Sequence, residues 1–229
     1  MQDYGLGKED RAPQRTTLLL AASAVLLCWV IPGLHWLTMP LQYLYTHLHE
    51  IGHALAAVVS GGVGVRIEVF SNGSGVTESW GGSQLLMSPA GYVGATAMGA
   101  MLLALARDEK GAKAGLMGLG GLIALAVLLW VRGDLFGLFS ALVFAALLLG
   151  LGAKLPKEMA VPTAQFLGVY LCLASIQSVL AIFGIGGMAL ENDALILERA
   201  TGIPAILSAV TWTLLSLWIV MLGLKRSWR

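Results

Sequence analysis

Apolar runs long enough to cross a lipid bilayer follow one another along almost the whole chain. A hydrocarbon core of about 30 Å takes roughly 20 apolar residues in a helix, and the runs repeatedly reach that length. The 229 residues are 57% hydrophobic and only 12% charged. A soluble domain carries about 25% charged residues, so an ordinary water-soluble fold is excluded. We expect an all-α, polytopic integral membrane protein in contact with the lipid bilayer.

About seven transmembrane helices are expected, with six as the alternative. The apolar segments lie at approximately residues 16–38, 41–60, 85–106, 114–131, 135–153, 161–187 and 203–224. Pro40 is expected to separate the first two segments, and Arg132-Gly133-Asp134 to close the fourth and fifth into a tight hairpin. Residues 1–15 are expected to form a polar N-terminal tail, and residues 16–229 a single membrane-embedded domain.

The charges of the chain indicate neither a nucleic-acid partner nor a membrane orientation. The formal net charge is +1, so no global field attracts nucleic acid. Seven spans would divide the 14 Lys and Arg residues six against eight between the two membrane faces. Because the positive-inside rule needs a clear excess on one face, this division leaves the orientation open. The expected location is multi-pass, in a bacterial plasma membrane.

One connection between apolar segments has the pattern of a β-hairpin, at about residues 63–82. In VGVRIEVFSNGSGVTESWGG, apolar and polar residues alternate on both sides of Asn72-Gly73, which is a strong signal for a tight hairpin turn. Unpaired strand edges cannot face lipid, so the hairpin must lie at the interface or be enclosed by protein. It is either an ordinary extramembrane turn or an edge strand, carrying Val65, Ile67 and Val69, that holds an extended peptide.

The second apolar segment contains the pattern H-E-x-x-H, at His49-Glu50-Ile51-Gly52-His53. Histidines four residues apart on an α-helix project to one side, about one turn apart, and can bind the same metal ion. Zinc suits two imidazoles and one carboxylate, with a fourth position open for water. Glu50 then points toward that position, where it can act as general base on the zinc-bound water. The pattern predicts a catalytic metal centre.

One structural alternative accompanies this hypothesis. Ionisable groups inside a membrane cost roughly 2.5 kcal/mol or more each, so they are rare without a partner or a function. The His and Glu side chains could instead hydrogen-bond between helices and hold the bundle together. His47 lies two residues before His49 and points elsewhere on the helix, which favours a packing or supporting role. His35 is interpreted as an interfacial residue.

A third metal ligand must come from elsewhere in the chain. Asp193, just before the seventh segment, and Asp134, at the start of the fifth, are the leading candidates. Each could equally be a helix N-cap, the common reason for an aspartate at such a place. Glu68 and Glu78 in the hairpin are the remaining candidates. We favour Asp193 among these four, followed by Asp134, and the residues alone leave the other candidates open.

With these residues, the chain resembles the site-2 protease family of intramembrane zinc metalloproteases, and within it a compact bacterial and plant branch. The resemblance covers residues 40 to 224, in the order expected for the family. Besides HEIGH and the hairpin, the matching motifs are SPAGYVGATAMGA at 88–100, VRGDLFG at 131–137 and NDALILERATGIP at 192–204. The first of these is similar to the Gly-rich helix that packs on the zinc helix in the family.

The resemblance implies one Zn²⁺ per chain, held by His49, His53 and a distant aspartate, with Glu50 as catalytic base. The Asn-Pro-Asp-Gly and Leu-Asp-Gly motifs of better-known members are absent. The acidic element of the compact branch maps to Asp193, with Asp134 as the alternative ligand. The implied activity is that of an endopeptidase acting on a membrane-anchored protein or peptide in or near the bilayer, so that residues 16–229 would be a metallopeptidase domain.

Two other functions use the same histidines. A membrane metal transporter or sensor would need further His, Asp or Glu ligands along a path, and the spans after residue 60 contain almost none. A catalytically inactive pseudo-protease could keep the motif for packing. The sequence identifies neither the substrate, nor the physiological trigger, nor the oligomeric state.

Overall fold

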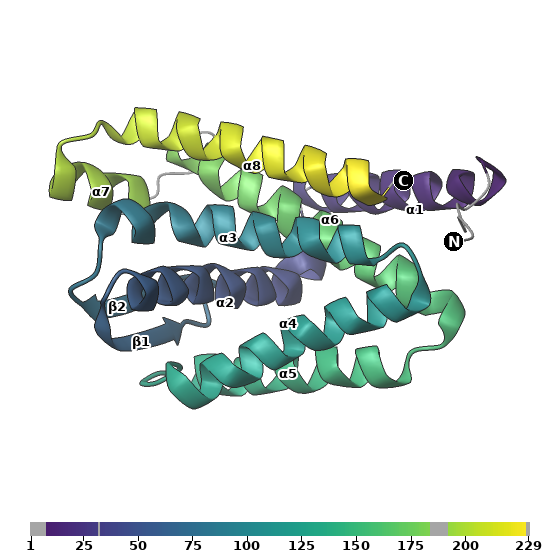
Figure 1. Ribbon diagram of the computed structural model, residues 1–229, viewed down its shortest axis with the longest axis horizontal. Helices are drawn as coiled ribbons and strands as arrows, with labels where there is room; N and C mark the ends of the chain where they lie inside the picture. Colours follow the sequence, from purple (N-terminus) through teal and green to yellow (C-terminus); the bar gives the residue numbers. More distant parts are fainter. Residues whose placement is uncertain (1–7, 32, 184–191, 228–229) are drawn as a thin grey trace, which may run out of the picture.

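Eight helices and two strands are found in residues 8–31, 33–183 and 192–227, the part of the chain that the computed structural model describes (Figure 1). In chain order they are α1 (Lys8–Val30), α2 (His35–Val59), β1 (Val63–Val69), β2 (Gly75–Trp80), α3 (Gln84–Leu105), α4 (Glu109–Leu129), α5 (Leu135–Lys154), α6 (Lys157–Ile182), α7 (Asp193–Thr201) and α8 (Ala205–Ser227). The expected helical fold with one small hairpin is confirmed.

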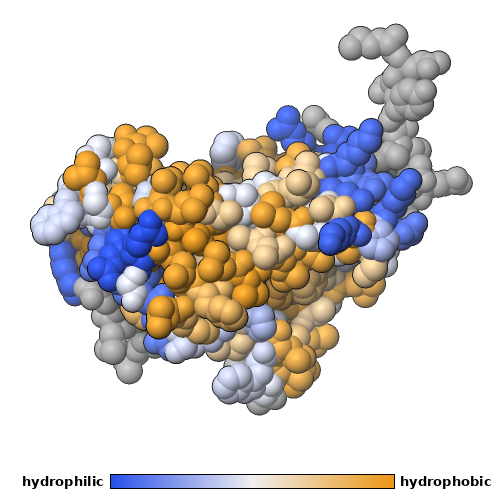
Figure 2. Space-filling view, turned by 90° about the horizontal axis from the view of Figure 1, so that it is seen from below, coloured by the Kyte–Doolittle hydropathy of each residue, from blue (hydrophilic) through white to orange (hydrophobic). Residues whose placement is uncertain are grey.

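Five of the described helices, α3, α4, α5, α6 and α8, are long and apolar enough to cross a membrane. Figure 2 shows the corresponding surface, an apolar band between hydrophilic clusters at the two ends of the molecule. The expected count of seven is not reached on this measure. The apolar part of α1 is the shorter stretch Thr16–Val30, and α2 carries the polar residues of the H-E-x-x-H motif.

The break between the first two helices does not lie at Pro40, contrary to the sequence-based expectation. Pro40 is inside α2, in its second turn, and the chain instead breaks between Val30 and His35. Gly33 in this connection has φ +87°, a left-handed conformation that ends a right-handed helix and that glycine adopts without steric cost. The lost N–H of Pro40 removes one helical hydrogen bond, which a membrane helix tolerates.

Helix α2 lies at the centre of the fold, packed against α3, α6, α5 and the β-hairpin. The contact with α3 is so close that a Cβ at Gly52 would collide with the backbone carbonyl of Ala90. The Gly-rich segment SPAGYVGATAMGA, at residues 88–100 of α3, contacts two neighbours. Gly91 faces α2, while a Cβ at Gly99 would lie 2.9 Å from the carbonyl oxygen of Gly168 in α6. The expectation that this Gly-rich segment packs on the helix of the H-E-x-x-H motif therefore holds for its first part only.

The hairpin forms where the sequence predicts it, with β1 and β2 antiparallel and Ile67 opposite Thr77. Gly73 has φ +89° in the turn, and the Asn72 side chain accepts a hydrogen bond from the Ser74 N–H. Because β1 and β2 are the two strands of this sheet, the outer edge of each needs a partner or a cover from another part of the chain.

The outer edge of β1 is covered, which corrects the interpretation of Val65, Ile67 and Val69 as a strand open to a peptide. The Ile67 N–H donates to the carbonyl of Trp130 at 2.9 Å, and its own carbonyl accepts from the Arg132 N–H at 3.1 Å. Beside Val69, a Cβ on Gly137 of α5 would lie 2.8 Å from the Val69 carbonyl oxygen. The connection between α4 and α5 therefore occupies the outer edge of β1. The opposite edge of the sheet belongs to β2.

The close approach of α2 and α3 is tested by a matched pair of glycine substitutions. Gly52→Ala would force a methyl group onto a backbone carbonyl that cannot rotate away, and should cost about 1–3 kcal/mol of stability. Gly94→Ala is the control, because its Cβ would meet the nearest atom, the Gly52 Cα, at an ordinary 3.5 Å. Thermal unfolding of both variants in detergent micelles measures the difference. Equal melting temperatures would contradict the packing described here.

Candidate metal centre

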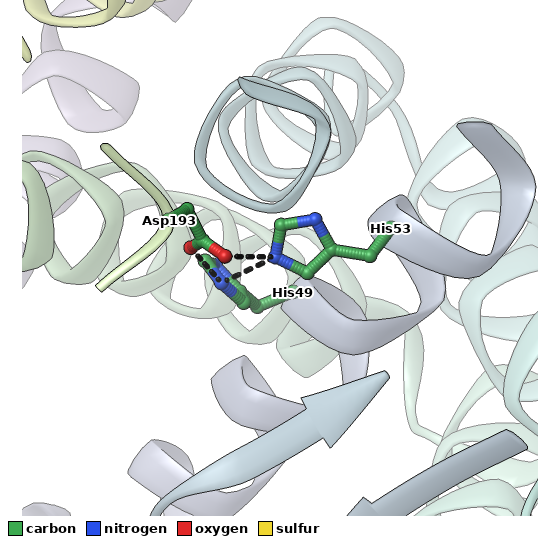
Figure 3. A group of neighbouring side chains, drawn as sticks. All are labelled: His49, His53 and Asp193. Carbon is green, nitrogen blue, oxygen red and sulfur yellow. Dashed lines mark hydrogen bonds and ion pairs between the residues drawn. The ribbon is translucent and has the colours of Figure 1, made fainter. Parts of the chain in front are cut away.

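Three side chains from two distant parts of the chain converge on one point (Figure 3). His49 and His53 lie one turn apart on α2, with their Nε2 atoms separated by 3.0 Å. Asp193 reaches them from the first residue of α7. Its Oδ2 lies 3.4 Å from Nε2 of His49, and its Oδ1 lies 3.4 Å from Nε2 of His53. The structure thus brings both histidines of the motif together with one of the four acidic residues considered.

The spacing of these donor atoms fits a single small metal ion. Ligands at about 2.0–2.1 Å from a tetrahedral zinc ion are roughly 3.3 Å apart, close to the separations between His49, His53 and Asp193. Among the described residues, they form the one group of three or more His, Cys, Asp or Glu side chains with such spacing. Without an ion, the two Nε2 atoms at 3.0 Å need a proton between them, so one of the two rings must carry its hydrogen on Nε2.

Hydrogen bonds on the far side of each ring orient the imidazoles. Nδ1 of His53 lies 2.7 Å from the carbonyl oxygen of Met87 in α3. Since a carbonyl only accepts, Nδ1 carries the proton and Nε2 keeps its lone pair for a metal. Nδ1 of His49 lies 3.3 Å from the Tyr45 hydroxyl, one turn earlier on α2. The edge of Tyr92 packs against the His49 ring, with the ring centres 4.6 Å apart.

Asp193 is free to act as a ligand because a neighbour caps its helix. The side chain of Asn192 accepts hydrogen bonds from the Ala194 and Leu195 N–H groups, both at 3.1 Å, so Asn192 is the N-cap of α7. Burial raises the pKa of Asp193, but the positive charge and the hydrogen bonds that the two facing imidazoles supply in their protonated form outweigh that effect and hold the pKa well below its ordinary value. Asp193 therefore presents an ionised carboxylate to the histidines.

The other acidic candidates are engaged elsewhere or face solvent. Asp134 is the N-cap of α5, where its Oδ2 accepts a hydrogen bond from the Gly137 N–H at 2.7 Å. Glu68 forms an ion pair with Arg66 on β1, and Glu78 on β2 is exposed. The N-cap role that the sequence allowed for either aspartate thus belongs to Asp134 alone.

Glu50 is buried beside the three converging side chains, with 5% of its surface exposed. The Thr77 hydroxyl lies 2.7 Å from its Oε2 and 3.0 Å from its backbone carbonyl oxygen. A Cβ at Gly75 would lie 2.7 Å from Glu50 Oε1, so the glycine leaves room for the carboxylate. Glu50 lines the same cavity as His49, His53 and Asp193, a hollow of about 490 Å³ between α2, the hairpin, α3, α6 and α7.

Gly91 on α3 leaves free the space in front of the two imidazole nitrogens, where an ion would lie. A Cβ built on it would lie 2.5 Å from Nε2 of His49 and in collision with Nε2 of His53, the two nitrogens that point at the carboxylate. The sequence analysis assigned the Gly-rich segment that contains Gly91 to helix packing and missed this role. It also missed Thr77, Met87 and Tyr92, which come from other elements. Tyr45 was within reach, since it lies four residues before His49 on the same helix face.

The other two histidines lie outside the group formed by His49, His53 and Asp193, here called the metal group. His47 is 1% exposed, and its Nε2 lies 2.8 Å from the Ser140 hydroxyl of α5. The hydroxyl of Ser140 in turn donates to the Gly137 carbonyl at 3.2 Å. His47 therefore ties α2 to α5, in agreement with the packing interpretation. The side chain of His35 lies outside the described residues.

Substitution of Gly91 should separate metal binding from folding. Gly91→Ala places a methyl group between the imidazole nitrogens, so we expect a loss of at least tenfold in divalent metal affinity. Gly94→Ala, one turn along α3, should bind metal as the wild type does. Metal content by mass spectrometry, together with the melting temperature, distinguishes loss of the ion from loss of the fold. Full metal occupancy in Gly91→Ala would place the ion somewhere else.

A family match found by comparison with known proteins covers nearly the whole of this architecture. A family model described as Peptidase M50B-like matches residues 18–223, a range that includes α2, the hairpin and Asp193. Comparisons with curated proteins and with solved structures returned no match. The family match confirms the resemblance to the site-2 protease family that the sequence motifs indicated. The chain belongs to the Peptidase M50B-like family of membrane peptidases.

Proposed function

We propose that this protein is a zinc-dependent intramembrane endopeptidase, with His49, His53 and Asp193 as the ligands of one zinc ion and Glu50 as the catalytic base. The observation that carries the proposal is the convergence of two imidazoles and a carboxylate beside a buried glutamate on one cavity. Such a donor set, with one coordination position left open, is typical of catalytic zinc. Membership of a peptidase family supports the reaction type.

The zinc ion would supply Lewis acidity, polarising the scissile carbonyl and making a water molecule more acidic. The residues of the chain provide the proton transfers and the orientation. Glu50 accepts the proton of the attacking water and later gives it to the nitrogen of the leaving amine. Because both carboxylate oxygens of Glu50 lie near Thr77 or Gly75, the group is held in place and not free to rotate into solvent.

The substrate would bind as an extended segment along β2. Since Ile67 directs its N–H and carbonyl away from β2, the pair Ile67–Thr77 is of the non-hydrogen-bonded kind, and Thr77 directs its own backbone groups to the outer edge. Gly75 and Thr77 also line the cavity that holds the metal group. A peptide that pairs with this edge would have its carbonyls near the zinc position. A helical substrate must unwind first, since an intact helix uses its own carbonyls.

A transporter or sensor function has less support. A transport path needs successive ligand groups, and the part of the chain that the structure describes holds the single group already discussed. An inactive pseudo-protease would not need a buried glutamate positioned by Thr77 beside the metal group. Both alternatives are decided by the experiments below.

Glu50→Gln should abolish peptide hydrolysis and leave zinc bound. The amide keeps the size of the side chain but cannot accept the proton, so turnover should fall by about 10²–10⁴. Wild type and variant are reconstituted in vesicles with a library of single-span peptides, and cleavage is followed by mass spectrometry. The zinc content of both proteins is measured in parallel. Equal cleavage by the two proteins would remove Glu50 from the reaction.

The third ligand is tested by two alanine variants. Asp193→Ala removes a carboxylate that faces both imidazoles, so zinc affinity should fall by at least tenfold. Asp134→Ala removes only the N-cap of α5, which costs about 1 kcal/mol of stability and should leave zinc binding unchanged. Zinc titration with a competing chelator measures both affinities. The reverse order of affinities would make Asp134 the ligand.

A further inference from the structure

The described bundle has two ends with different contents. One end, here called the site end, carries β1, β2, α7 and the connection from α4 to α5 (Figure 1). The opposite end, here called the distal end, carries the connections from α3 to α4 and from α5 to α6, together with the C-terminal end of α8. The metal group lies toward the site end, because Asp193 belongs to α7 and Glu50 contacts β2.

The break between α1 and α2 lies at neither end but near the middle of the bundle. Trp29, one residue before the end of α1, packs edge-on against Tyr170, with ring centres 6.2 Å apart. The Tyr170 hydroxyl donates to the carbonyl of Thr38, in the first turn of α2, at 3.4 Å. Tyr170 is at the midpoint of α6, which runs from the distal end to the site end. The end of α1 and the start of α2 therefore meet halfway across.

The first half of α1 lies toward the distal end. Leu18 and Ala21 belong to a cluster with Leu103, in the last turn of α3, and with Leu224, near the end of α8. In Figure 1 the N-terminal end of α1 lies beyond the distal ends of these helices. Helix α1 thus runs inward from the distal end, and α2 continues to the site end. Together they make one broken crossing, which brings the five candidate spans to six crossings.

Six crossings change the distribution of basic residues between the two faces. The first turns of α1 now belong to the distal end. Ten Lys and Arg positions of the described chain therefore lie at the distal end, in its connections and in the helix turns next to them. They are Lys8, Arg11, Arg15, Arg107, Lys110, Lys113, Lys154, Lys157, Lys225 and Arg226. The site end has three, Arg66, Arg132 and Arg199. If the three positions in α1 are not counted, the distal end still has seven basic residues and the site end three.

The few cations at the site end have local structural partners. Arg66 pairs with Glu68 across the face of β1. The guanidinium of Arg132 donates to the carbonyls of Val127 and Leu128, at 2.8 and 2.6 Å, and so caps the C-terminal end of α4. These two charges are explained by the fold, whereas most of the distal cations lie in connections or helix ends.

From this distribution we propose that the distal end is cytoplasmic and that the metal cavity opens on the opposite, non-cytoplasmic side of the membrane. Short loops rich in Lys and Arg stay in the cytoplasm, and an excess of ten to three sets the orientation of the whole bundle. The hairpin and α7, which line the cavity through Thr77 and Asn192, then lie at the non-cytoplasmic face.

The orientation also defines a class of substrate, a step that rests on the proposed peptidase function. A segment that reaches β2 in an extended form must come from the non-cytoplasmic face, because both the strand edge and the cavity lie there. The substrate would be a membrane-anchored protein with its cleavable segment at or just below the non-cytoplasmic surface. Cytoplasmic juxtamembrane segments would lie at the far end of the bundle.

Cysteine accessibility in intact cells tests the orientation directly. Ser71→Cys places a thiol on the exposed hairpin turn, and Glu158→Cys places one at the exposed distal start of α6. Neither change alters a Lys or Arg. A membrane-impermeant maleimide should label Ser71→Cys in intact cells, and should label Glu158→Cys only after the cells are permeabilised. The wild-type chain gives the background from Cys28 and Cys172.

The opposite labelling pattern, or labelling of both positions in intact cells, would overturn the proposed orientation. A membrane-permeant maleimide verifies that both thiols are reactive, so that an unlabelled thiol reports its side of the membrane. Labelling does not require peptide hydrolysis. A failed orientation would therefore leave the peptidase proposal standing, and a peptidase failure in the Glu50→Gln experiment would leave the orientation standing.

Discussion

Ionisable side chains inside an apolar helix bundle are stable only when they bind each other, a hydrogen-bond partner or a metal. In this protein His49, His53 and Asp193 satisfy that condition by converging on one point, while Thr77 holds Glu50 beside them. The rest of the fold supplies what this group needs. α3 approaches closely enough for the Met87 carbonyl to orient one imidazole, and Gly91 contributes no side chain where the ion would lie.

The same arrangement explains why a small hairpin lies between two membrane helices. Its first strand has its outer edge bonded to the connection between α4 and α5, so it is fixed to the bundle. Its second strand then faces the cavity with Gly75 and Thr77, one leaving space for Glu50 and the other bonding to it. One strand anchors the hairpin, and the other shapes the candidate site. A peptide bound to β2 would complete the sheet on the side of the metal.

The local parts of this account could be predicted from the sequence. His49, Glu50 and His53 follow from helical spacing alone, and the turn at Asn72-Gly73 follows from residue type. Asp193 could be favoured over Asp134 but not cleanly separated from it, because each precedes a helix and the decision depends on Asn192, which caps one helix in place of the aspartate. The blocked edge of β1 depends on a contact between residues over 60 positions apart.

The position of the first helix break was predicted wrongly for a related reason. Pro40 is the stronger local signal, but Gly33 has the backbone conformation that ends the helix. That difference of a few residues decides whether α1 and α2 cross the membrane twice or once, and with it the face on which the basic residues of α1 lie. Only the packing of Trp29 and Thr38 around Tyr170 places the break in the middle of the bundle.

The central claim is that one zinc ion is held by two imidazoles and one carboxylate. X-ray absorption at the zinc edge of the purified protein tests it most directly. We expect one zinc per chain with three or four nitrogen and oxygen ligands at about 2.0–2.1 Å. The spectrum should also show the multiple-scattering signature of two imidazoles, and this signature should be lost when His49 and His53 are replaced. A zinc ion bound by thiolates, or an imidazole signature unchanged by those replacements, would contradict it.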